Sequence, residues 1–278
     1  MEIDPENKKV PGSLEGQHIF FSREETHKHA LDIIADTSIA LHNGEFKTII
    51  GPSGCGKTTM LSILSGLLKP DKGLVLLNGK PITELSEKLG LPTPDDIGVV
   101  FQDYGLFPWR TVFGNVAFGL EMSGMEKGKC AVKVEDTLRR VGLWEFRNHF
   151  PHQLSGGMKQ RTSIARVLAT DAEFLLMDEP FSALDFQTRY YMQEFLLEVW
   201  KKFGKTIIYV THHIDEAITL SDTVYLMTAR PGRIIEEMKI DLPRPRSITD
   251  PKFTEYRNHI AKHLEAEVHK IFSDQKSS

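Results

Sequence analysis

The sequence predicts an α/β fold in which helices wrap a parallel sheet and a further helical segment is inserted into the chain. Three observations predict it. Strand-like and helix-like patterns alternate in the second half of the chain, a glycine-rich loop joins a strand to a helix near residue 50, and β-branched runs disappear between about residues 111 and 154. With 278 residues, 40% hydrophobic and 26% charged, the chain has the size and composition of one globular domain with a subdomain.

Composition and charge exclude several classes of protein. Lys plus Arg total 34 and Asp plus Glu total 38, and the formal net charge of −4 disfavours a nucleic-acid-binding protein, which needs a basic surface. The two cysteines, Cys55 and Cys130, are too few for a disulfide framework or a zinc–thiolate cluster and suit a reducing cytosol. The stretch MEIDPENKK lacks the apolar segment of a secretion signal, and no apolar run approaches the roughly 20 residues that span a bilayer.

Turn residues and apolar periodicity place the elements in order. Residues 1–16 are polar, with two prolines and two glycines, and are expected to be a loose lead-in. Strands are predicted over 18–21, 37–41, 45–50, 74–77 and 98–101, with a helix over 57–67. Helices over 111–122 and 130–141 form the insertion. Helices over 157–169, 187–203 and 215–220 then alternate with strands over 173–177, 206–211 and 223–227, which is typical of a parallel sheet wrapped by helices.

The last predicted helix, over residues 251–272, has a single apolar stripe. Its members recur at steps of three or four residues and are Phe253, Tyr256, Ile260, Leu264, Val268 and Ile271. Such a helix either covers the core of its own domain or binds a partner.

Residues 51–58 read GPSGCGKT and match the phosphate-binding pattern GxxxxGK[ST] between a predicted strand and a predicted helix. Glycines let successive N–H groups converge on phosphate oxygens, and the helix N-terminus adds partial positive charge. Lys57 is expected to neutralise the β- and γ-phosphates, and the hydroxyl of Thr58 to bind Mg²⁺. The loop therefore predicts a site for a magnesium–nucleoside triphosphate.

Two carboxylates follow the apolar run Phe174–Met177. In a parallel sheet the carboxyl ends of the strands line the ligand crevice, so Asp178 is expected beside the phosphates as an outer partner of the metal. Glu179 points elsewhere and is placed to act as general base for the attacking water.

Two further polar residues each follow a predicted strand. Gln102 comes after the strand over 98–101, where a neutral amide would ligate Mg²⁺ or hold the water. His212 comes after the strand over 206–211, where an imidazole would hydrogen-bond the γ-phosphate and sense its presence.

The stretch LSGGMKQR over residues 154–161 forms a second possible anion-binding surface, because a serine and two glycines precede a helix. One nucleotide does not need two phosphate cradles. Two chains arranged head to tail do, since each would then complete the site of the other.

In these motifs the chain closely resembles the ATP-binding-cassette (ABC) family. Six motifs occur in the family's order between about residues 17 and 230. They are GPSGCGKTT, the loop at Gln102, LSGGMKQR, FLLMDEP, the turn SALD ending at Asp185, and YVTHH.

The resemblance implies a P-loop NTPase core over residues 17–230, with an amino-terminal antiparallel β subdomain and an α-helical subdomain inserted at about 105–160. Residues 231–278 would be a carboxy-terminal extension that ends in the amphipathic helix. The expected cofactors are ATP and Mg²⁺, and the activity is ATP hydrolysis with Lys57, Glu179 and His212 as catalytic residues. The metal residues are Thr58, Gln102 and Asp178. The nucleotide-binding residues are Gly51, Pro52, Ser53, Gly54, Cys55, Gly56, Lys57, Thr58 and Thr59.

The same resemblance implies a head-to-tail dimer closed by two ATP molecules. Ser155, Gly156 and Gly157 would contact the nucleotide of the second copy, and Asp185 would communicate across the interface. Closure would drive transmembrane permease subunits, and indirectly an extracytoplasmic solute-binding protein, from the cytoplasmic face of the inner cell membrane. No nucleic acid is expected.

Two positions depart from the family pattern or are ambiguous. The residue after the switch histidine is usually aspartate but is His213 here, and His212 keeps the sensing role because it directly follows Thr211. Phe21 is the expected adenine-stacking residue, with a loop over 22–29 after it. Phe20 and His27 are alternatives, and so is a plain core role for Phe21.

Within the family the chain is most similar to importer ATPases for nitrate, sulfonate, taurine and bicarbonate, on stretches such as FPWRTVFGNVAFGLE and PFSALDFQTR. The wedge Phe107–Trp109 either docks a permease or packs locally under the helical subdomain. A soluble cassette ATPase is disfavoured because the 98 residues between Lys57 and Ser155 leave no room for a coiled coil. Intact Glu179 and His212 disfavour a cassette that senses ATP without hydrolysing it. An exporter ATPase is disfavoured only by the subgroup resemblance. No residue of the chain identifies the transported solute.

Overall fold

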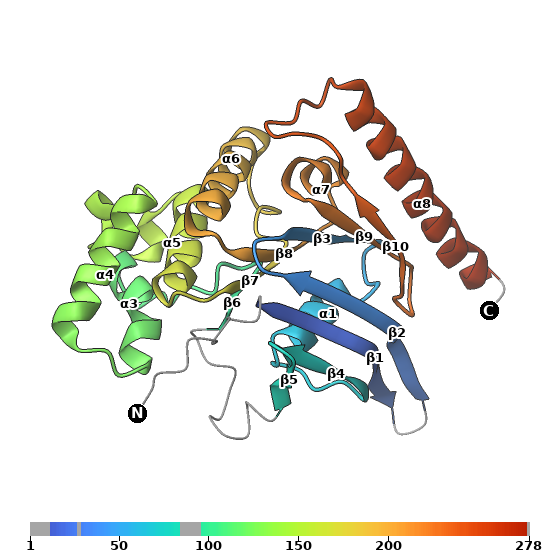
Figure 1. The fold of residues 1–278 in the computed structure, drawn as a ribbon, viewed down its shortest axis with the longest axis horizontal. Helices are drawn as coiled ribbons and strands as arrows, with labels where there is room; N and C mark the ends of the chain where they lie inside the picture. Colours follow the sequence, from blue (N-terminus) through green and yellow to red (C-terminus); the bar gives the residue numbers. More distant parts are fainter. Residues whose placement is uncertain (1–11, 27–28, 84–95, 277–278) are drawn as a thin grey trace, which may run out of the picture.

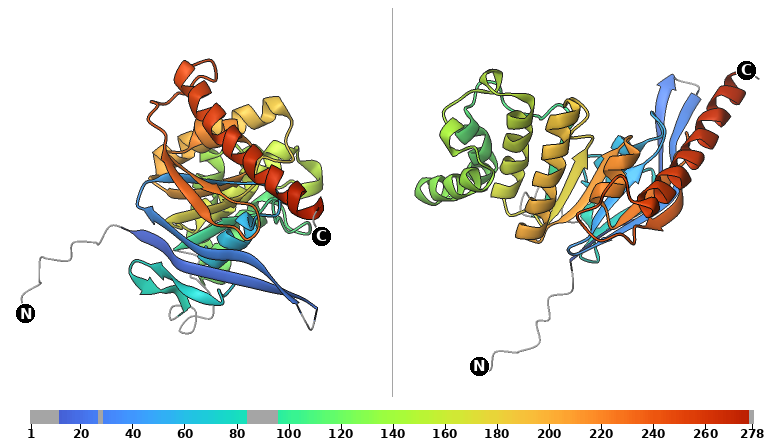
Figure 2. Two further views of the ribbon diagram at one scale, coloured as in Figure 1. Left: turned by 90° about the vertical axis from the view of Figure 1, so that its right-hand side faces the viewer. Right: turned by 90° about the horizontal axis from the view of Figure 1, so that it is seen from above.

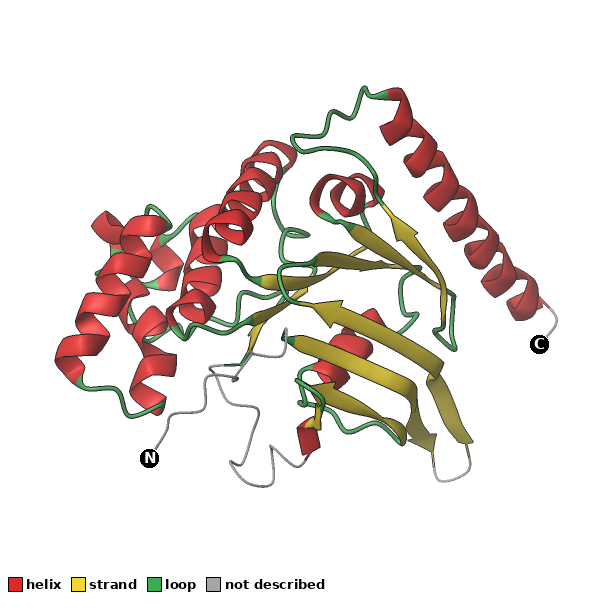
Figure 3. Cartoon of the chain, in the orientation of Figure 1, coloured by secondary structure: helices red, strands yellow, loops and turns green. Residues whose placement is uncertain are grey.

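The computed structural model describes residues 12–26, 29–83 and 96–276, and its larger sheet has six strands (Figures 1 and 3). The order is β10-β9-β3-β8-β7-β6, and all neighbours are parallel except β9 and β10. The strands are β3 (Phe46–Ile50), β6 (Ile97–Val100), β7 (Phe174–Asp178), β8 (Thr206–Thr211), β9 (Thr223–Met227) and β10 (Ile234–Lys239). Strands β3, β7 and β8 are buried along their whole length because layers cover both faces of the sheet.

The second sheet is antiparallel and confirms the amino-terminal β subdomain. Its order is β2-β1-β4-β5, formed by β1 (Ser13–Thr26), β2 (His29–His42), β4 (Lys72–Leu77) and β5 (Lys80–Pro81).

The predicted loop over 22–29 is wrong where the structure describes it. The β1–β2 ladder continues through Ser22 opposite Asp32 and Arg23 opposite Leu31, so the two strands form a long hairpin. Polar residues on this outer part of the hairpin hid the strand pattern. His27 lies outside the described residues, as does most of the predicted lead-in, and β1 begins at Ser13 within it.

The helices also follow the predicted order. Helix α1 (Lys57–Leu64) follows the glycine-rich loop. A helical lobe contains α3 (Val112–Met122), α4 (Lys127–Arg140) and two 3₁₀ turns (Trp144–Phe146 and Pro151–Gln153). The lobe also includes the start of α5 (Gly156–Ala169). The remaining helices are α6 (Phe186–Phe203), α7 (Ile214–Leu220) and α8 (Pro251–Lys276). The helical lobe and α8 lie at opposite ends of the molecule (Figure 2).

Apolar clusters on both faces hold the larger sheet in place. On one face Met177 and Tyr209 belong to a cluster with Ile164 of α5 and with residues of the helical lobe such as Val116. On the other face Leu176 packs with Met60 of α1 and with residues of the antiparallel sheet. The two faces are therefore covered, and the carboxyl ends of the strands are left to form a site.

Helix α8 covers its own domain. Phe253 and Ile260 are fully buried in a cluster with residues of α7, β9 and β10. Arg257 adds two hydrogen bonds to the carboxylate of Asp215, at 2.7 and 2.9 Å. Among the described residues, no helix has both the length and the apolar character needed to cross a bilayer.

Candidate functional site

The glycine-rich loop joins the end of β3 to the start of α1, as its spacing predicts. Gly56 begins the helix with a φ of 104°, and a Cβ there would lie 3.2 Å from atoms of Ile33. Only glycine adopts this conformation without strain. No side chain caps α1, so its first N–H groups remain available to an anion.

The loop holds its own lysine in position. The ammonium of Lys57 is buried and donates to the carbonyl oxygens of Gly51 at 2.8 Å and Pro52 at 3.0 Å. Cys55 is buried beneath the loop, and burial raises the pKa of its thiol. Cys55 therefore remains protonated near neutral pH and supports the loop by packing.

Thr58 and Asp178 lie next to each other, although they are far apart in sequence. The hydroxyl of Thr58 donates to Oδ1 of Asp178 at 3.1 Å. Asp178 is 6% exposed, and this burial raises the pKa of its carboxyl group. A buried carboxylate beside a hydroxyl is an all-oxygen donor set, which fits Mg²⁺.

Glu179 follows Asp178 and turns away from it. Its φ of 42° lies in the left-handed region, which costs a non-glycine residue about 1–2 kcal/mol. Its N–H donates to the carbonyl of Val210 at 3.0 Å, and its Oε2 lies 2.9 Å from Nδ1 of His212. The predicted base and the predicted sensor are thus directly paired.

Gln102 is linked to this pair only through Ser182, whereas the ring of His213 lies beside that of His212, with 4.1 Å between ring centres. The amide nitrogen of Gln102 donates to the hydroxyl of Ser182 at 3.3 Å, and that hydroxyl donates to the carbonyl of Glu179 at 2.9 Å. His213 also contacts Arg189, with 3.1 Å between Nε2 and the guanidinium. Burial lowers the pKa of His213, and the nearby charges of His212 and Arg189 lower it further. His213 is therefore neutral near pH 7.

A cleft of about 520 Å³ lies over the loop. Eight of the predicted site residues line it: Phe21, Ser53, Gly54, Gly56, Lys57, Thr58, Thr59 and Glu179. Phe21 also packs against the adjoining apolar cluster, so it combines a core contact with a position in the cleft. The alternative Phe20 instead lies near Lys72, whose ammonium is 5.8 Å from the centre of the phenylalanine ring.

Four lining residues were missed by sequence reasoning: Arg23, Ile33, Leu68 and Arg230. The guanidinium of Arg230 donates to the carbonyl of Gly54, with distances of 3.2 and 3.3 Å. Arg23 and Arg230 supply positive charge suited to phosphates. Arg23 lies in β1 and Arg230 in the turn between β9 and β10, both outside any motif, and only the turn sequence ARPG hinted at a special role for Arg230.

The turn that contains Arg230 also fastens β2 to the phosphate loop. Gly232 donates to the carbonyl of Ile33 at 2.8 Å and accepts from the N–H of Ala35 at 3.1 Å. A Cβ on Gly232 would lie 2.2 Å from the carbonyl oxygen of Cys55, so the loop and the turn are in direct backbone contact. The position of the loop therefore depends on a segment that sequence reasoning assigned to the extension.

The predicted signature residues do not line the cleft of their own chain. Ser155 caps α5, and its hydroxyl accepts a hydrogen bond from the N–H of Met158 at 3.3 Å. Asp185 caps α6, and its carboxylate accepts a hydrogen bond from the N–H of Thr188 at 3.0 Å. These two helix starts pack together, since a Cβ on Gly157 would lie 3.0 Å from the methyl of Thr188. The hydrogen bond from Thr188 lowers the pKa of Asp185.

Comparisons with known proteins agree with this geometry. The ABC transporter family profile matches residues 34–182, more than half of the chain. The chain is 48% identical to an uncharacterized ABC transporter ATP-binding protein of Methanocaldococcus jannaschii, covering 96% of this chain and 98% of that protein. It is 41% identical to a taurine import ATP-binding protein of Yersinia pseudotuberculosis, covering 82% and 89%.

A solved structure shows the same fold. A dimeric ATP-binding cassette in a post-hydrolysis state, bound to ADP and Pi, superposes with a TM-score of 0.71 and 30% identity. The match covers 83% of this chain and 100% of that chain.

Proposed function

The chain belongs to the ABC transporter family as an ATP-binding and ATP-hydrolysing cassette, and we propose that it drives the import of a small solute through a separate permease. The proposal rests first on the cleft, where Lys57, Thr58 and Glu179 lie around one cavity and Asp178 is bonded to Thr58 behind them. These residues lie at or after the carboxyl ends of two strands, β3 and β7, which meet at one edge of the sheet.

In this proposal the cleft binds ATP. The loop N–H groups and the start of α1 hold the phosphates, Lys57 balances their charge, and Phe21 stacks on the adenine. Thr58 and Asp178 would hold Mg²⁺, with Gln102 moving in from Ser182. When bound, the metal neutralises charge on the β- and γ-phosphate oxygens.

For hydrolysis, Glu179 accepts a proton from the attacking water while the water oxygen bonds to the γ-phosphorus. The bond from that phosphorus to the β–γ bridging oxygen breaks, which yields ADP and inorganic phosphate. His212 holds the Glu179 carboxylate through the 2.9 Å contact and, in this proposal, would hydrogen-bond the γ-phosphate.

The proposed working unit is a head-to-tail dimer of this chain. The signature residues Ser155, Gly156 and Gly157 do not line their own cleft, and in this proposal a second copy brings them to the nucleotide. The dimeric arrangement of the related ADP-bound cassette supports this assembly. Asp185, at the start of α6 beside the signature, would carry the signal between the two sites.

The permease contact is proposed at the wedge Phe107–Trp109. Trp109 is 72% exposed, so the alternative in which it packs into a local core is wrong. Phe107, in contrast, is half-buried and packs on Phe118 with 4.5 Å between ring centres. An exposed indole beside a half-buried anchor is suited to docking on an apolar partner. Through the permease the chain would lie at the cytoplasmic face of the membrane.

The proposed solute is a small oxyanion or sulfonate, of the nitrate, sulfonate, taurine or bicarbonate type. The support is the 41% identity to a taurine import ATP-binding protein over 82% of this chain. An extracytoplasmic solute-binding protein would deliver the solute to the permease.

Affinity purification of the chain from detergent-solubilised membranes, followed by mass spectrometry, tests the transport role. A multi-span permease is expected in stoichiometric amount. Trp109→Ala should lower its recovery, whereas Val132→Ala, at a site that is 71% exposed on α4, should not. Recovery of soluble partners alone, with ATP hydrolysis intact, would instead indicate a cassette ATPase that acts outside transport.

A further inference from the structure

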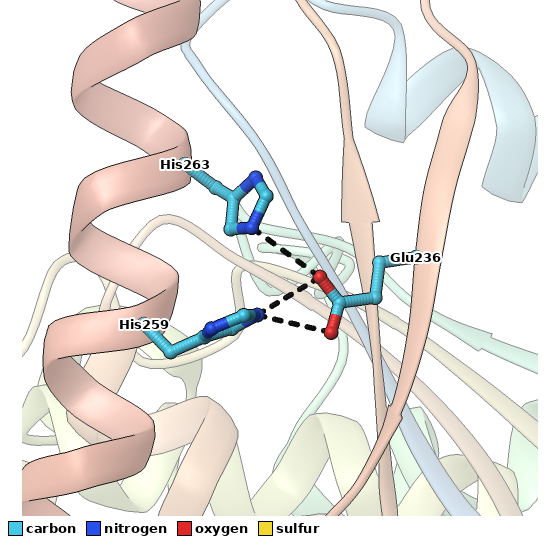
Figure 4. Close-up of side chains that lie close together, drawn as sticks. All are labelled: Glu236, His259 and His263. Atoms are coloured by element: carbon cyan, nitrogen blue, oxygen red, sulfur yellow. Dashed lines mark hydrogen bonds and ion pairs between the residues drawn. The ribbon is translucent and has the colours of Figure 1, made fainter.

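A cluster of metal-binding side chains lies outside the nucleotide cleft, where α8 lies beside the edge strand β10 (Figure 4). Nε2 of His259 lies 2.9 Å from Oε2 of Glu236 and 3.0 Å from its Oε1. Nε2 of His263 lies 3.4 Å from the same Oε2. One ligand atom from each residue lies within 4.8 Å of the other two, so donor atoms from two elements converge on one point.

The local structure explains this convergence. Along β10, Ile234, Glu236 and Met238 share the less exposed face, while Glu237 points to the other face and pairs with Lys47 at 3.2 Å. On α8, His259 and His263 are four residues apart and therefore lie one above the other on one face of the helix. A carboxylate on the helix-facing side of an edge strand thus meets two stacked imidazoles.

We propose that Glu236, His259 and His263 bind a divalent transition-metal ion of the zinc class. Imidazole nitrogen and carboxylate oxygen are both zinc ligands, and two histidines with one carboxylate form a known three-ligand set. Tetrahedral coordination with bonds of about 2.0–2.1 Å places the ligand atoms about 3.3 Å apart. The 3.4 Å separation of His263 from Glu236 meets this, and the 2.9 Å separation of His259 from Glu236 is about 0.4 Å shorter.

The exposure of the cluster suits an exchangeable ion. The side chains of His259, His263 and Glu236 are 46%, 40% and 32% exposed. Metal ions therefore have direct access, and water is available as the fourth ligand.

The metal would tie the carboxy-terminal helix to the sheet. The first half of α8 is held by buried Phe253 and Ile260 and by the Arg257–Asp215 pair. A metal bonded to β10 and to two successive turns of α8 would fix the middle of the helix as well. Metal binding should therefore slow local opening of α8.

The test is titration of the full-length, metal-free and nucleotide-free protein with ZnCl₂ by isothermal calorimetry, and with CoCl₂ by visible absorption. The expected result is one site per chain and the absorption of tetrahedrally coordinated Co²⁺. Glu236→Gln and His263→Gln should each abolish that site. His269→Gln, which removes an exposed histidine of the same helix, should retain it.

Hydrogen exchange provides a readout that does not depend on the variants. Zinc should slow amide exchange within α8 of the wild-type protein, and chelation should reverse the effect. The proposal is overturned if the wild type shows neither the one-site titration nor slower amide exchange in α8 with zinc. It is also overturned if folded Glu236→Gln and His263→Gln proteins bind zinc as the wild type does. A second site in the nucleotide cleft would persist in both variants and would be displaced by magnesium–ATP.

Discussion

At Glu179 the backbone and the side chain are both constrained by their neighbours. The residue keeps a left-handed φ of 42° while its carboxylate contacts His212 at 2.9 Å. Strain of this kind persists only where the surrounding structure enforces it, and it is common at functional sites. The geometry thus separates Glu179 from Asp178 although the two are adjacent in sequence.

Glu179→Gln should retain ATP binding and ATP-dependent dimerisation but lower the hydrolysis rate by about 10²- to 10⁴-fold, because an amide does not accept the proton of the attacking water. Steady-state phosphate release measures the rate, and size-exclusion chromatography with ATP measures the dimer. Glu198→Gln, at an exposed position on α6, is the matched control. Brisk hydrolysis by Glu179→Gln would remove this residue from its role.

We expect Asp178 to destabilise the metal-free fold at neutral pH. Its folded pKa is raised by burial above the ordinary value of 3.8, so the stability that this group contributes is present below that pH and is lost as the pH rises through the folded pKa. Asp178→Asn should therefore raise the melting temperature at pH 7 while it abolishes magnesium-dependent hydrolysis.

The gain in melting temperature should shrink as the pH is lowered through the raised folded pKa toward the ordinary value of 3.8, because the wild-type carboxyl group becomes protonated in the folded state. Thermal unfolding across this pH range measures the effect. Asp241→Asn, at an exposed position, should change little. An unchanged or lower melting temperature for Asp178→Asn at pH 7 would contradict the account.

Among the elements, the turn between β9 and β10 determines where the phosphate loop sits. Gly232→Ala would force a Cβ to within 2.2 Å of the carbonyl oxygen of Cys55, and the backbone has to move to relieve this contact. The expected loss of stability is about 1–3 kcal/mol. ATP binding should weaken at the same time because the loop is displaced.

Denaturant unfolding and nucleotide titration measure the two effects of Gly232→Ala. Gly128→Ala is the control, since the nearest atom to its added Cβ is a glutamate oxygen at 3.5 Å, an ordinary contact. Normal ATP affinity in a destabilised Gly232→Ala protein would show that the turn supports the fold but not the loop.

For the whole molecule, the proposed dimer predicts complementation between two inactive chains. Lys57→Ala should lose ATP binding. Ser155→Asp should keep the cap of α5, because aspartate caps helices well, while its charge repels the nucleotide of the partner. A mixed dimer has one site with an intact loop and an intact signature.

Equal mixing of the two variants should restore about a quarter of wild-type hydrolysis, because half of the dimers are mixed and each has one working site. Each variant alone serves as the control. Absence of recovery in verified mixed dimers would contradict the head-to-tail arrangement, and so would activity of Ser155→Asp alone.

The sequence by itself determined the parts whose signals are local. The glycine-rich loop, the strand ending in Asp178 and Glu179, and the parallel order of strands and helices follow from short-range spacing, and the structure confirms the fold. Strand β10 was missed because its sequence IIEEMK lacks a clean alternation. The β1–β2 hairpin was underestimated because its outer part is polar.

Only the tertiary structure decided which distant residues share a site. Arg230 and Gly232 reach the phosphate loop because β9 pairs with β3, and the contact between Thr58 and Asp178 spans 120 residues. Glu236 meets His259 and His263 because α8 packs back on the sheet. Such contacts depend on strand order and helix packing, which no local pattern encodes, so they emerge only when the chain is folded.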